Sequence, residues 1–172
     1  MQAGVVLAVV LLVTSVAPQC AVPQAEAARQ LTLRYEQFDG ENGSHGWRQL
    51  NEKGCVDAVL RLLQDYSTAN TRRLTQAQRS EIAFHQGQVL GFNGRDREAL
   101  PHFEEALRIG GDDEWTTYIR ATVAFLRRDM NELHRHRQHY ATLAPDSMRL
   151  RVLDGFLKCS GDSYMQAMHC GM

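Results

Sequence analysis

The chain has 172 residues, of which 44% are hydrophobic and 23% charged, and its formal net charge is −1 at pH 7. This composition is typical of a single globular domain that buries well over half of its unfolded surface, and it leaves little room for disorder. Because neither a basic excess nor a basic stripe is present, the composition argues against a nucleic-acid binder.

Residues 1–27 are predicted to be a secretory signal peptide. Residues 5–16 form an apolar run that is shorter than the roughly 20-residue helix needed to cross a bilayer. Residues 25–27 (Ala-Glu-Ala) supply a cleavage signal, although no Lys or Arg precedes the apolar run. An uncleaved anchor is the alternative, whereas a lipid anchor at Cys20 is disfavoured because Pro and Gln precede it. We therefore expect a periplasmic or secreted chain with net charge near zero and no stable membrane anchor after cleavage.

Residues 28–46 are predicted to form an extended N-terminal arm and loop. Leu31, Leu33 and Tyr35 alternate with polar residues, which is the pattern of a short strand. A loop rich in Gly, Asn and Ser follows at residues 39–46. Since the sequence offers no partner strand, we expect this arm to lie extended, or as a frayed helix, over the first helical hairpin.

Residues 47–172 show helical patterns throughout. Residues 47–53 and 55–66 indicate a short and a longer helix, separated by Gly54, which we interpret as a degenerate first hairpin. Thr75, with Gln78 three residues later, is a capping box that opens the next helix. Two further hairpins are predicted over residues 113–144 and 147–170.

The stretch from residue 82 to residue 109 predicts two helices folded back on each other. Apolar residues recur mostly at three- and four-residue intervals up to Asn93, and again from Asp96 onward. Gly94 suits the left-handed conformation that ends a helix, and the Asp96 carboxylate suits the capping of the next one. Small residues let the two backbones approach closely, namely Gly87, Ala99 and Ala106.

This hairpin resembles a unit of the tetratricopeptide repeat family, in which 34-residue helix-turn-helix units stack on one another. The family's small, alanine, aromatic and small positions are occupied by Gly87, Ala99, Phe103 and Ala106, whereas its helix-A tryptophan and leucine are missing. A step of 34 residues leads to Ala121, Leu133, Arg137, Tyr140 and Pro145, and a second step leads to Gly155 and Ala167.

The resemblance covers residues 75–172 and implies a fold. The expected fold is all-α, a right-handed superhelix of about three to four antiparallel helical hairpins over residues 47–172. Together with the predicted signal peptide, the resemblance suggests a bacterial secreted or periplasmic protein of the tetratricopeptide-repeat kind.

The resemblance also implies a binding site. In this family, side chains of the first helix of each hairpin line a concave surface that suits a peptide or a helix of a partner protein. Transferred by position, the partner-binding groove consists of Phe84, His85, Gln88, Phe92, Trp115, Tyr118, Thr122 and Phe125. Two alternatives stay open. The rings belong to the core between hairpins, or the chain is a structural subunit whose groove is filled by its own N-terminal arm.

Three histidines in a basic run suggest a metal site at first sight. His134 and His136 point about 200° apart on a helix, so these two and His139 cannot converge on one ion. We therefore predict no metal site, and interpret the run as a solvated basic face. A milder role is the attraction of an acidic partner, which strengthens below about pH 6.5.

No enzyme signature is present. The sequence lacks HExxH, GxSxG, a phosphate-binding glycine loop and a Cys-x-x-Cys pair. Cys55 with His85 is the one thiolate pair considered, and a packed cysteine is the commoner outcome. We predict no enzyme and no cofactor, and a hydrolase or metal protein is an unlikely alternative.

Three cysteines remain after the expected cleavage: Cys55, Cys159 and Cys170. In an oxidising compartment two of them are expected to pair. Cys159 and Cys170 are the pair of choice because they close a small loop across the last hairpin, although their unequal distances from the turn strain the geometry.

Overall fold

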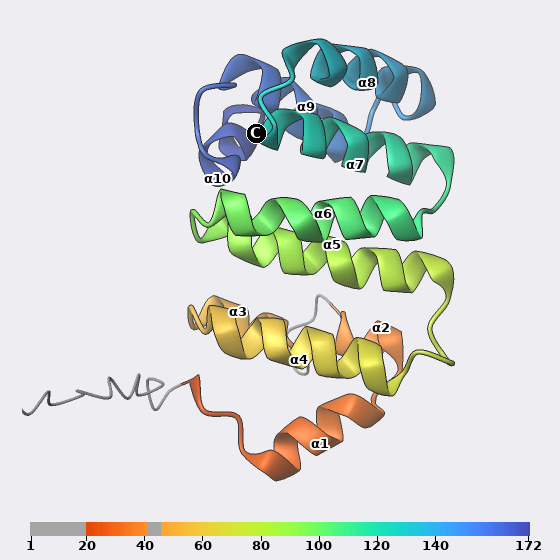
Figure 1. The fold of residues 1–172 in the computed structure, drawn as a ribbon, viewed down its shortest axis with the longest axis vertical. Helices are drawn as coiled ribbons and strands as arrows, with labels where there is room; N and C mark the ends of the chain where they lie inside the picture. The colour runs from red at the N-terminus through yellow and green to blue at the C-terminus, as the bar shows by residue number, and fades with distance from the viewer. Residues whose placement is uncertain (1–19, 41–45) are drawn as a thin grey trace, which may run out of the picture.

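The computed structural model describes residues 20–40 and 46–172, so most of the predicted signal peptide lies outside it (Figure 1). Within these ranges the chain forms ten helices and no strand, which confirms the all-α prediction there. The helices are α1 Gln24–Thr32, α2 Tyr35–Phe38, α3 Arg48–Glu52, α4 Val56–Ala69, α5 Gln76–Phe92, α6 Asp96–Ile109, α7 Asp113–Leu126, α8 Met130–Leu143, α9 Met148–Lys158 and α10 Tyr164–Cys170. No helix in the described ranges has the length and apolar character to cross a membrane.

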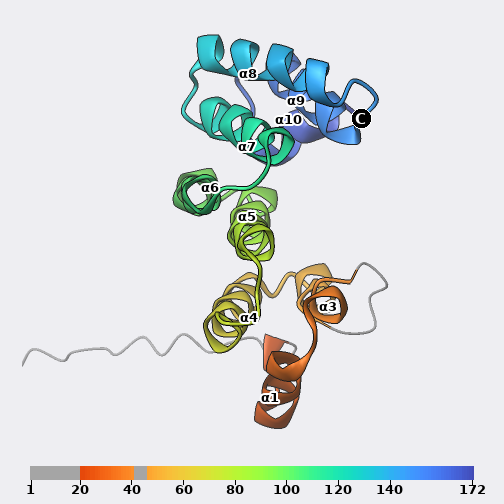
Figure 2. The same cartoon turned by 90° about the vertical axis from the view of Figure 1, so that its right-hand side faces the viewer.

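Helices that follow each other in the chain pack in pairs. The most extensive packing joins α5 to α6, α7 to α8 and α9 to α10, and α6 packs against α7 to link the first two pairs. Figure 2 shows α5 and α6 nearly end-on, above α3 and α4 and below α7 and α8. At the far end, α10 turns back and reaches α5.

The turns within the pairs follow local sequence signals. Gly94 has φ of 72° between α5 and α6, as the sequence predicts for a helix-ending glycine. The Thr75–Gln78 capping box opens α5. Arg128, which is 34 residues after Gly94, has φ of 60° between α7 and α8. Its guanidinium donates to the backbone carbonyls of Ser160 and Asp162, so this side chain bridges to the turn between α9 and α10.

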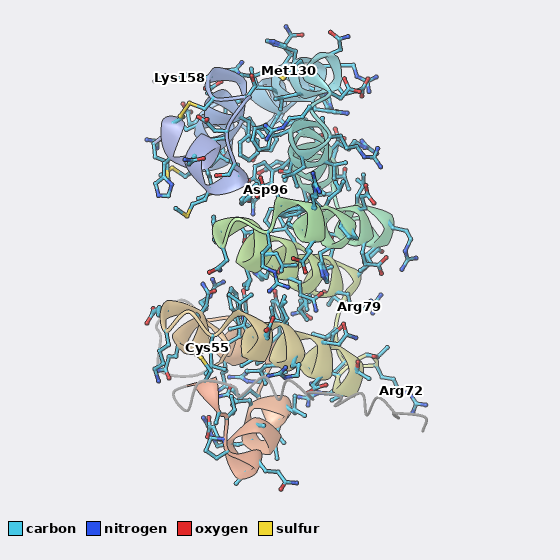
Figure 3. All side chains as sticks on the ribbon, turned by 60° about the vertical axis from the view of Figure 1, so that its left-hand side comes forward. Cys55, Arg72, Arg79, Asp96, Met130 and Lys158 are labelled. Carbon is cyan, nitrogen blue, oxygen red and sulfur yellow. A yellow bond between two sulfur atoms is a disulfide. The ribbon has the colours of Figure 1, made fainter. Side chains whose placement is uncertain are left out.

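Asp96 does not cap α6 in the predicted way. The N-cap of α6 is Arg95, and no side chain caps it. The Asp96 carboxylate instead accepts a hydrogen bond from the backbone N–H of Tyr164 at 3.0 Å, which anchors the first residue of α10 to the α5–α6 turn (Figure 3). A capping group has thus been used for a contact between distant parts of the chain.

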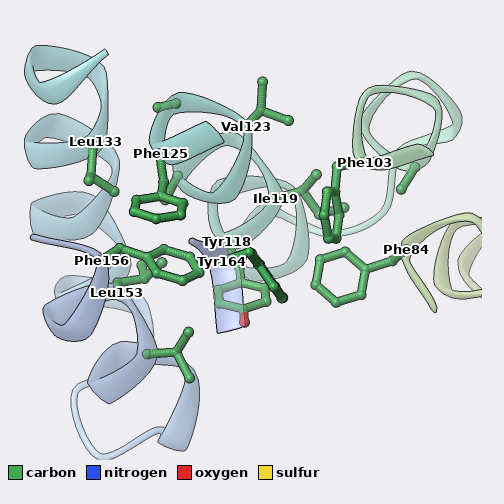
Figure 4. Close-up of a cluster of buried hydrophobic side chains, with 14 of the residues drawn as sticks. Phe84, Phe103, Tyr118, Ile119, Val123, Phe125, Leu133, Leu153, Phe156 and Tyr164 are labelled. Atoms are coloured by element: carbon green, nitrogen blue, oxygen red, sulfur yellow. The ribbon is translucent and has the colours of Figure 1, made fainter. Parts of the chain in front are cut away.

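Glycines create the close contacts of the central core. A Cβ atom on Gly87 would lie 2.9 Å from the Phe103 ring, and one on Gly91 would lie 2.6 Å from the Tyr164 ring. Phe103 and Tyr164 are both fully buried, and their ring centroids are 5.4 Å apart. The larger of two buried clusters is built around these rings and extends from α5 to α10 (Figure 4).

The second buried cluster lies at the N-terminal end. It is formed by Phe38, Trp47, Tyr66 and apolar side chains of α4 and α5. Phe38 stacks on Tyr66 with centroids 3.7 Å apart. Val56 and Leu60 of α4 pack against both clusters, so α4 joins the two cores.

In the described part of residues 28–46 the chain is helical and not extended, so the extended form of the predicted arm is wrong and the helical alternative is the nearer one. Residues 24–32 and 35–38 are helical, and only Leu33 and Arg34 between them have extended backbone, with ψ of 151° and 155°. The alternation of Leu31, Leu33 and Tyr35 arises because the chain bends between two short helices, so these side chains reach one core from different elements. One backbone carbonyl at this bend, that of Leu33, accepts a hydrogen bond from Tyr66 Oη at 2.8 Å.

Two disulfides tie the ends of the chain. Cys159 and Cys170 are bonded, which is the pair chosen from the sequence. Cys20 is bonded to Cys55, so Cys55 is not left over as expected. The expected cleavage signal at residues 25–27 lies in α1, and a cut after residue 27 before the bond forms would leave Cys20 outside the mature chain, so that this disulfide could not form.

Candidate functional site

Most of the predicted groove residues are buried. Phe84, Trp115, Tyr118, Thr122 and Phe125 are between 0% and 9% exposed, whereas His85, Gln88 and Phe92 are half-buried. The prediction of an open aromatic groove is therefore wrong for the five buried residues, which belong to the core between helix pairs.

Ring contacts explain this burial. The Phe84 ring lies 4.9 Å from that of Phe103 and 4.8 Å from that of Trp115, and the Phe125 ring stacks 4.4 Å from that of Phe156. Apolar spacing on a helix identifies a buried face, but it does not distinguish a ligand from a neighbouring helix as the group that covers it. Here the neighbouring helices cover the rings.

Other parts of the chain partly cover one side of α5, which carries Glu81, His85 and Phe92. Tyr35 Oη donates to Glu81 Oε2 at 2.8 Å, His85 Nε2 lies 3.3 Å from Asp39 Oδ1, and the Phe92 ring lies 5.6 Å from that of Tyr164. The N-terminal segment therefore contacts Glu81 and His85 on this side of α5, and α10 contacts Phe92 at the end of the helix.

Asp39, which follows α2, is the centre of a polar cluster that packs against His85 of α5. Its Oδ1 accepts a hydrogen bond from Trp47 Nε1 at 3.0 Å and lies 3.2 Å from the Arg48 guanidinium. Burial disfavours the charged form, but the hydrogen bond and charge of His85, with Arg48 and Trp47, keep the pKa of Asp39 below its ordinary value. On its other side the His85 ring meets Gln88, with 3.0 Å between Nδ1 and Oε1. These contacts hold the segment around Asp39 and Trp47 against α5. The described residues of this cluster include no nucleophile.

The considered thiolate pair is absent. Cys55 is held in the disulfide with Cys20, so it supplies no thiolate for His85 to activate.

An open groove of about 560 Å³ lies over α7, between α6 and α8. We call it the α6–α8 groove. Its apolar part consists of Leu107, Val123 and Ala124. Its cationic part consists of three arginines and two histidines, namely Arg120, Arg127, Arg135, His136 and His139. Asp129 and Glu132 are the acidic residues of its lining.

Most cations of the α6–α8 groove take part in exposed ion pairs. Arg127 contacts Glu104 at 2.7 Å, and Arg135 contacts Glu132. No ion pair of Arg120 is found within the described ranges, and its side chain is exposed. Exposed pairs contribute about 0–1 kcal/mol each, so a bound carboxylate can replace the resident one at little cost.

The two groove histidines are also paired with carboxylates. His139 Nε2 lies 3.0 Å from Asp113 Oδ2, and His136 Nε2 lies 3.2 Å from Glu132 Oε2. Burial, aided by the charge of Arg135, keeps the pKa of His136 below its ordinary value. His134 is exposed and outside the groove lining, in line with its divergence on the helix.

A smaller pocket of about 140 Å³ keeps one predicted residue near the surface. Trp115 lines it together with Glu114 of the same helix and Arg149 of α9. The Arg149 guanidinium lies 5.0 Å from the Trp115 ring centroid and 3.3 Å from Glu114. Arg149 therefore covers the ring face that the predicted groove would have offered to a partner.

Comparison with known proteins gives no relative: no family model, curated protein or solved structure matches the chain. The groove residues therefore stand on geometry alone. A sequence signal for them did exist, since Arg120 and Arg127 are seven residues apart, and Arg135 and His139 on the next helix are four apart.

Proposed function

We propose that the chain is a protein-binding module which holds an acidic segment of a partner protein in the α6–α8 groove. The observation that carries the proposal is the set of three arginines from α7 and α8 around an apolar floor. Guanidinium groups pair with carboxylates through two parallel hydrogen bonds, and the apolar floor gives contact area to the stem of a bound segment.

The proposal includes the finer fold prediction. We infer a right-handed superhelix of antiparallel hairpins, of the tetratricopeptide kind, and this inference is supported by the pairwise packing of α5–α10 and by the left-handed residues Gly94 and Arg128, which are 34 positions apart. Two disulfides support a periplasmic or secreted location, because disulfides persist in oxidising compartments. The proposal assigns no catalysis, cofactor or nucleic-acid partner.

The α6–α8 groove replaces the predicted concave aromatic groove as the binding site. The two lie on different sides of α7, and the α6–α8 groove is open and lined by three arginines and two histidines, whereas Arg149 covers the Trp115 ring of the predicted groove. A partner with a net negative segment would gain charge-assisted contacts there, and these would strengthen when His136, whose pKa is lowered by burial, becomes protonated.

The test is a binding titration with a labelled glutamate-rich peptide, followed by fluorescence anisotropy at low salt. Replacement of Arg120 and Arg127 by Glu should weaken binding tenfold or more, because two charge-assisted contacts become repulsive. Binding should also weaken with added salt and strengthen between pH 7.5 and pH 5.5.

Arg72→Glu is the matched control, since Arg72 is exposed and lies far from the groove, beyond α4 (Figure 3). An equal loss of affinity in this variant, or equal binding of a lysine-rich peptide, would contradict the proposed site.

A structural subunit with a self-covered face is the second candidate. It is favoured by the contacts that Tyr35, Asp39 and Tyr164 make with the partly exposed side of α5. If no acidic peptide binds the intact chain at low salt, this candidate becomes the better one.

A further inference from the structure

The exposed apolar residues of this protein are mostly methionines. In the described ranges four large hydrophobic side chains are exposed, namely Leu143 (38%), Met148 (53%), Met165 (41%) and Met172 (62%). Two of these methionines belong to α10 and the residues that follow it. A thioether differs from other apolar groups because its sulfur is a soft metal ligand.

Met165, His169 and Met172 lie on one side of the last helical turns. At about 100° per residue, side chains at i, i+4 and i+7 start within about 60° of one another around the helix axis. The helical path continues beyond the end of α10, since Gly171 has φ of −95° and ψ of −12° and Met172 N donates to His169 O at 3.2 Å. All three side chains are exposed. Met168 is nearby in sequence but packs partly buried against the core, so it is not needed for the site.

The His169 ring is already oriented for a ligand. Its Nδ1 lies 2.8 Å from the backbone carbonyl oxygen of Met165. A carbonyl only accepts, so Nδ1 is the donor in this contact, which leaves Nε2 as the ring nitrogen that can bind an ion. Ligating histidines in metal sites commonly make this contact through the ring nitrogen that does not bind the ion.

We propose that Met165, His169 and Met172 form a binding site for a soft monovalent metal ion, Cu(I) or Ag(I). Two thioethers and one imidazole favour these ions over Mg²⁺ or Ca²⁺, which prefer oxygen ligands. The sulfurs of Cys159 and Cys170 are bonded to each other, so the site is a thioether site and not a thiolate site. This inference is independent of the proposed function, because α10 does not line the α6–α8 groove.

The experiment uses the full chain with both disulfides intact, verified by the absence of free thiols, and Ag(I) as a probe that does not change its redox state. Methionine methyl groups labelled with ¹³C report on each sulfur separately. Saturation at one ion per chain, with shifts of the Met165 and Met172 methyl signals and of the His169 ring, is the expected result.

Variants separate a metal site from an apolar patch. Met165→Leu with Met172→Leu keeps the apolar volume and should lower the Ag(I) affinity tenfold or more, and His169→Gln should lower it several-fold. Met148→Leu is the control, because Met148 is equally exposed but begins α9, and its affinity should be unchanged. The proposal is overturned if Ag(I) does not bind, if the double variant binds as well as the parent chain, or if Met148→Leu loses as much affinity.

Discussion

At the N-terminal end, polar contacts hold α1 on α4, and the buried Phe38 ring of α2 stacks on Tyr66, whereas at the C-terminal end α10 is held by a ring buried among several aromatic neighbours. Tyr66 Oη donates to Leu33 O, and Asn70 Nδ2 donates to Leu31 O at 3.0 Å. The Tyr164 ring is instead fully buried among aromatic neighbours such as Phe103 and Phe156. Each end also has one disulfide.

The difference teaches how separable the two ends are. A hydrogen bond contributes about 1 kcal/mol net, while burial of a large aromatic ring contributes several times as much. We therefore expect the N-terminal end to open by itself, at a lower free energy than the α5–α10 core, as local units of helical arrays do.

Truncation of a core ring tests the stable side of this comparison. Tyr118→Ala is expected to lower the free energy of unfolding by about 3–5 kcal/mol, because the ring is only 3% exposed and lies in the larger cluster. Urea unfolding measures the loss. Phe38→Ala makes the matching truncation in the smaller cluster. In this variant, hydrogen exchange should become faster only in α1–α4. An unchanged urea midpoint for Tyr118→Ala would place this ring at a wet surface, as the sequence suggested.

Removal of each disulfide compares the two ends directly. Cys20 and Cys55 are 35 residues apart and Cys159 and Cys170 are 11 apart. Loop-closure entropy then predicts losses of about 4 and about 3 kcal/mol for the paired Cys→Ser variants. Chemical unfolding of both variants checks the order, and a larger loss at the C-terminal pair would reverse the comparison.

The N-terminal disulfide also bears on processing. If the chain is exported, we expect the mature form to retain Cys20, because a cut after residue 27 would sacrifice the stabilisation of about 4 kcal/mol. Intact mass measurement of the secreted or periplasmic form gives the first residue. A mature chain that starts at residue 28 would show that the disulfide is dispensable.

A glycine pair sharpens the packing argument at the C-terminal end. A Cβ on Gly155 would lie 2.3 Å from the Ala167 carbonyl oxygen, whereas one on Gly161 meets nothing within 4 Å. Gly155→Ala should therefore cost about 1–3 kcal/mol or more, since backbone must shift. Gly161→Ala should stay within about 0.5 kcal/mol of the parent chain. Similar melting temperatures for the two variants would mean that α9 and α10 do not touch at this point.

The smallest expected effect is local. Tyr66→Phe removes the donor to Leu33 O and should cost about 1 kcal/mol, seen mainly as faster hydrogen exchange in α1 and α2. Exchange in α7 and α8 should not change. A global loss spread over all helices would show that the N-terminal end is not a separate unit.

Sequence reasoning succeeded where the signal was local. The helical class, the turn at Gly94 and the capping box at Thr75 all follow from neighbouring residues. It failed where distant segments compete for one surface. Nothing near His85 or Phe92 indicates that Asp39 and Tyr164 will cover them.

The α6–α8 groove was not predicted, because it too depends on contacts between distant segments. The histidines of α8 were visible as part of a basic run, but the sequence did not show that His136 and His139 would meet the arginines around an apolar floor. That arrangement depends on the spacing between α6 and α8, which only the packing of α7 determines.

The position of Tyr164 imposes an order of assembly during synthesis. The α5–α6 pair is complete in sequence at Ile109, yet its core contains the Tyr164 ring, which rests on Gly91 and beside Phe103. Roughly 55 residues separate these points, so at 5–20 residues per second the ribosome delivers the ring about 3–11 s later. During this interval the nascent pair exposes the apolar surface around Gly91 that α10 finally covers. Completion of the first pair is thus a late event, and the interval is the time at which a chaperone would find this chain.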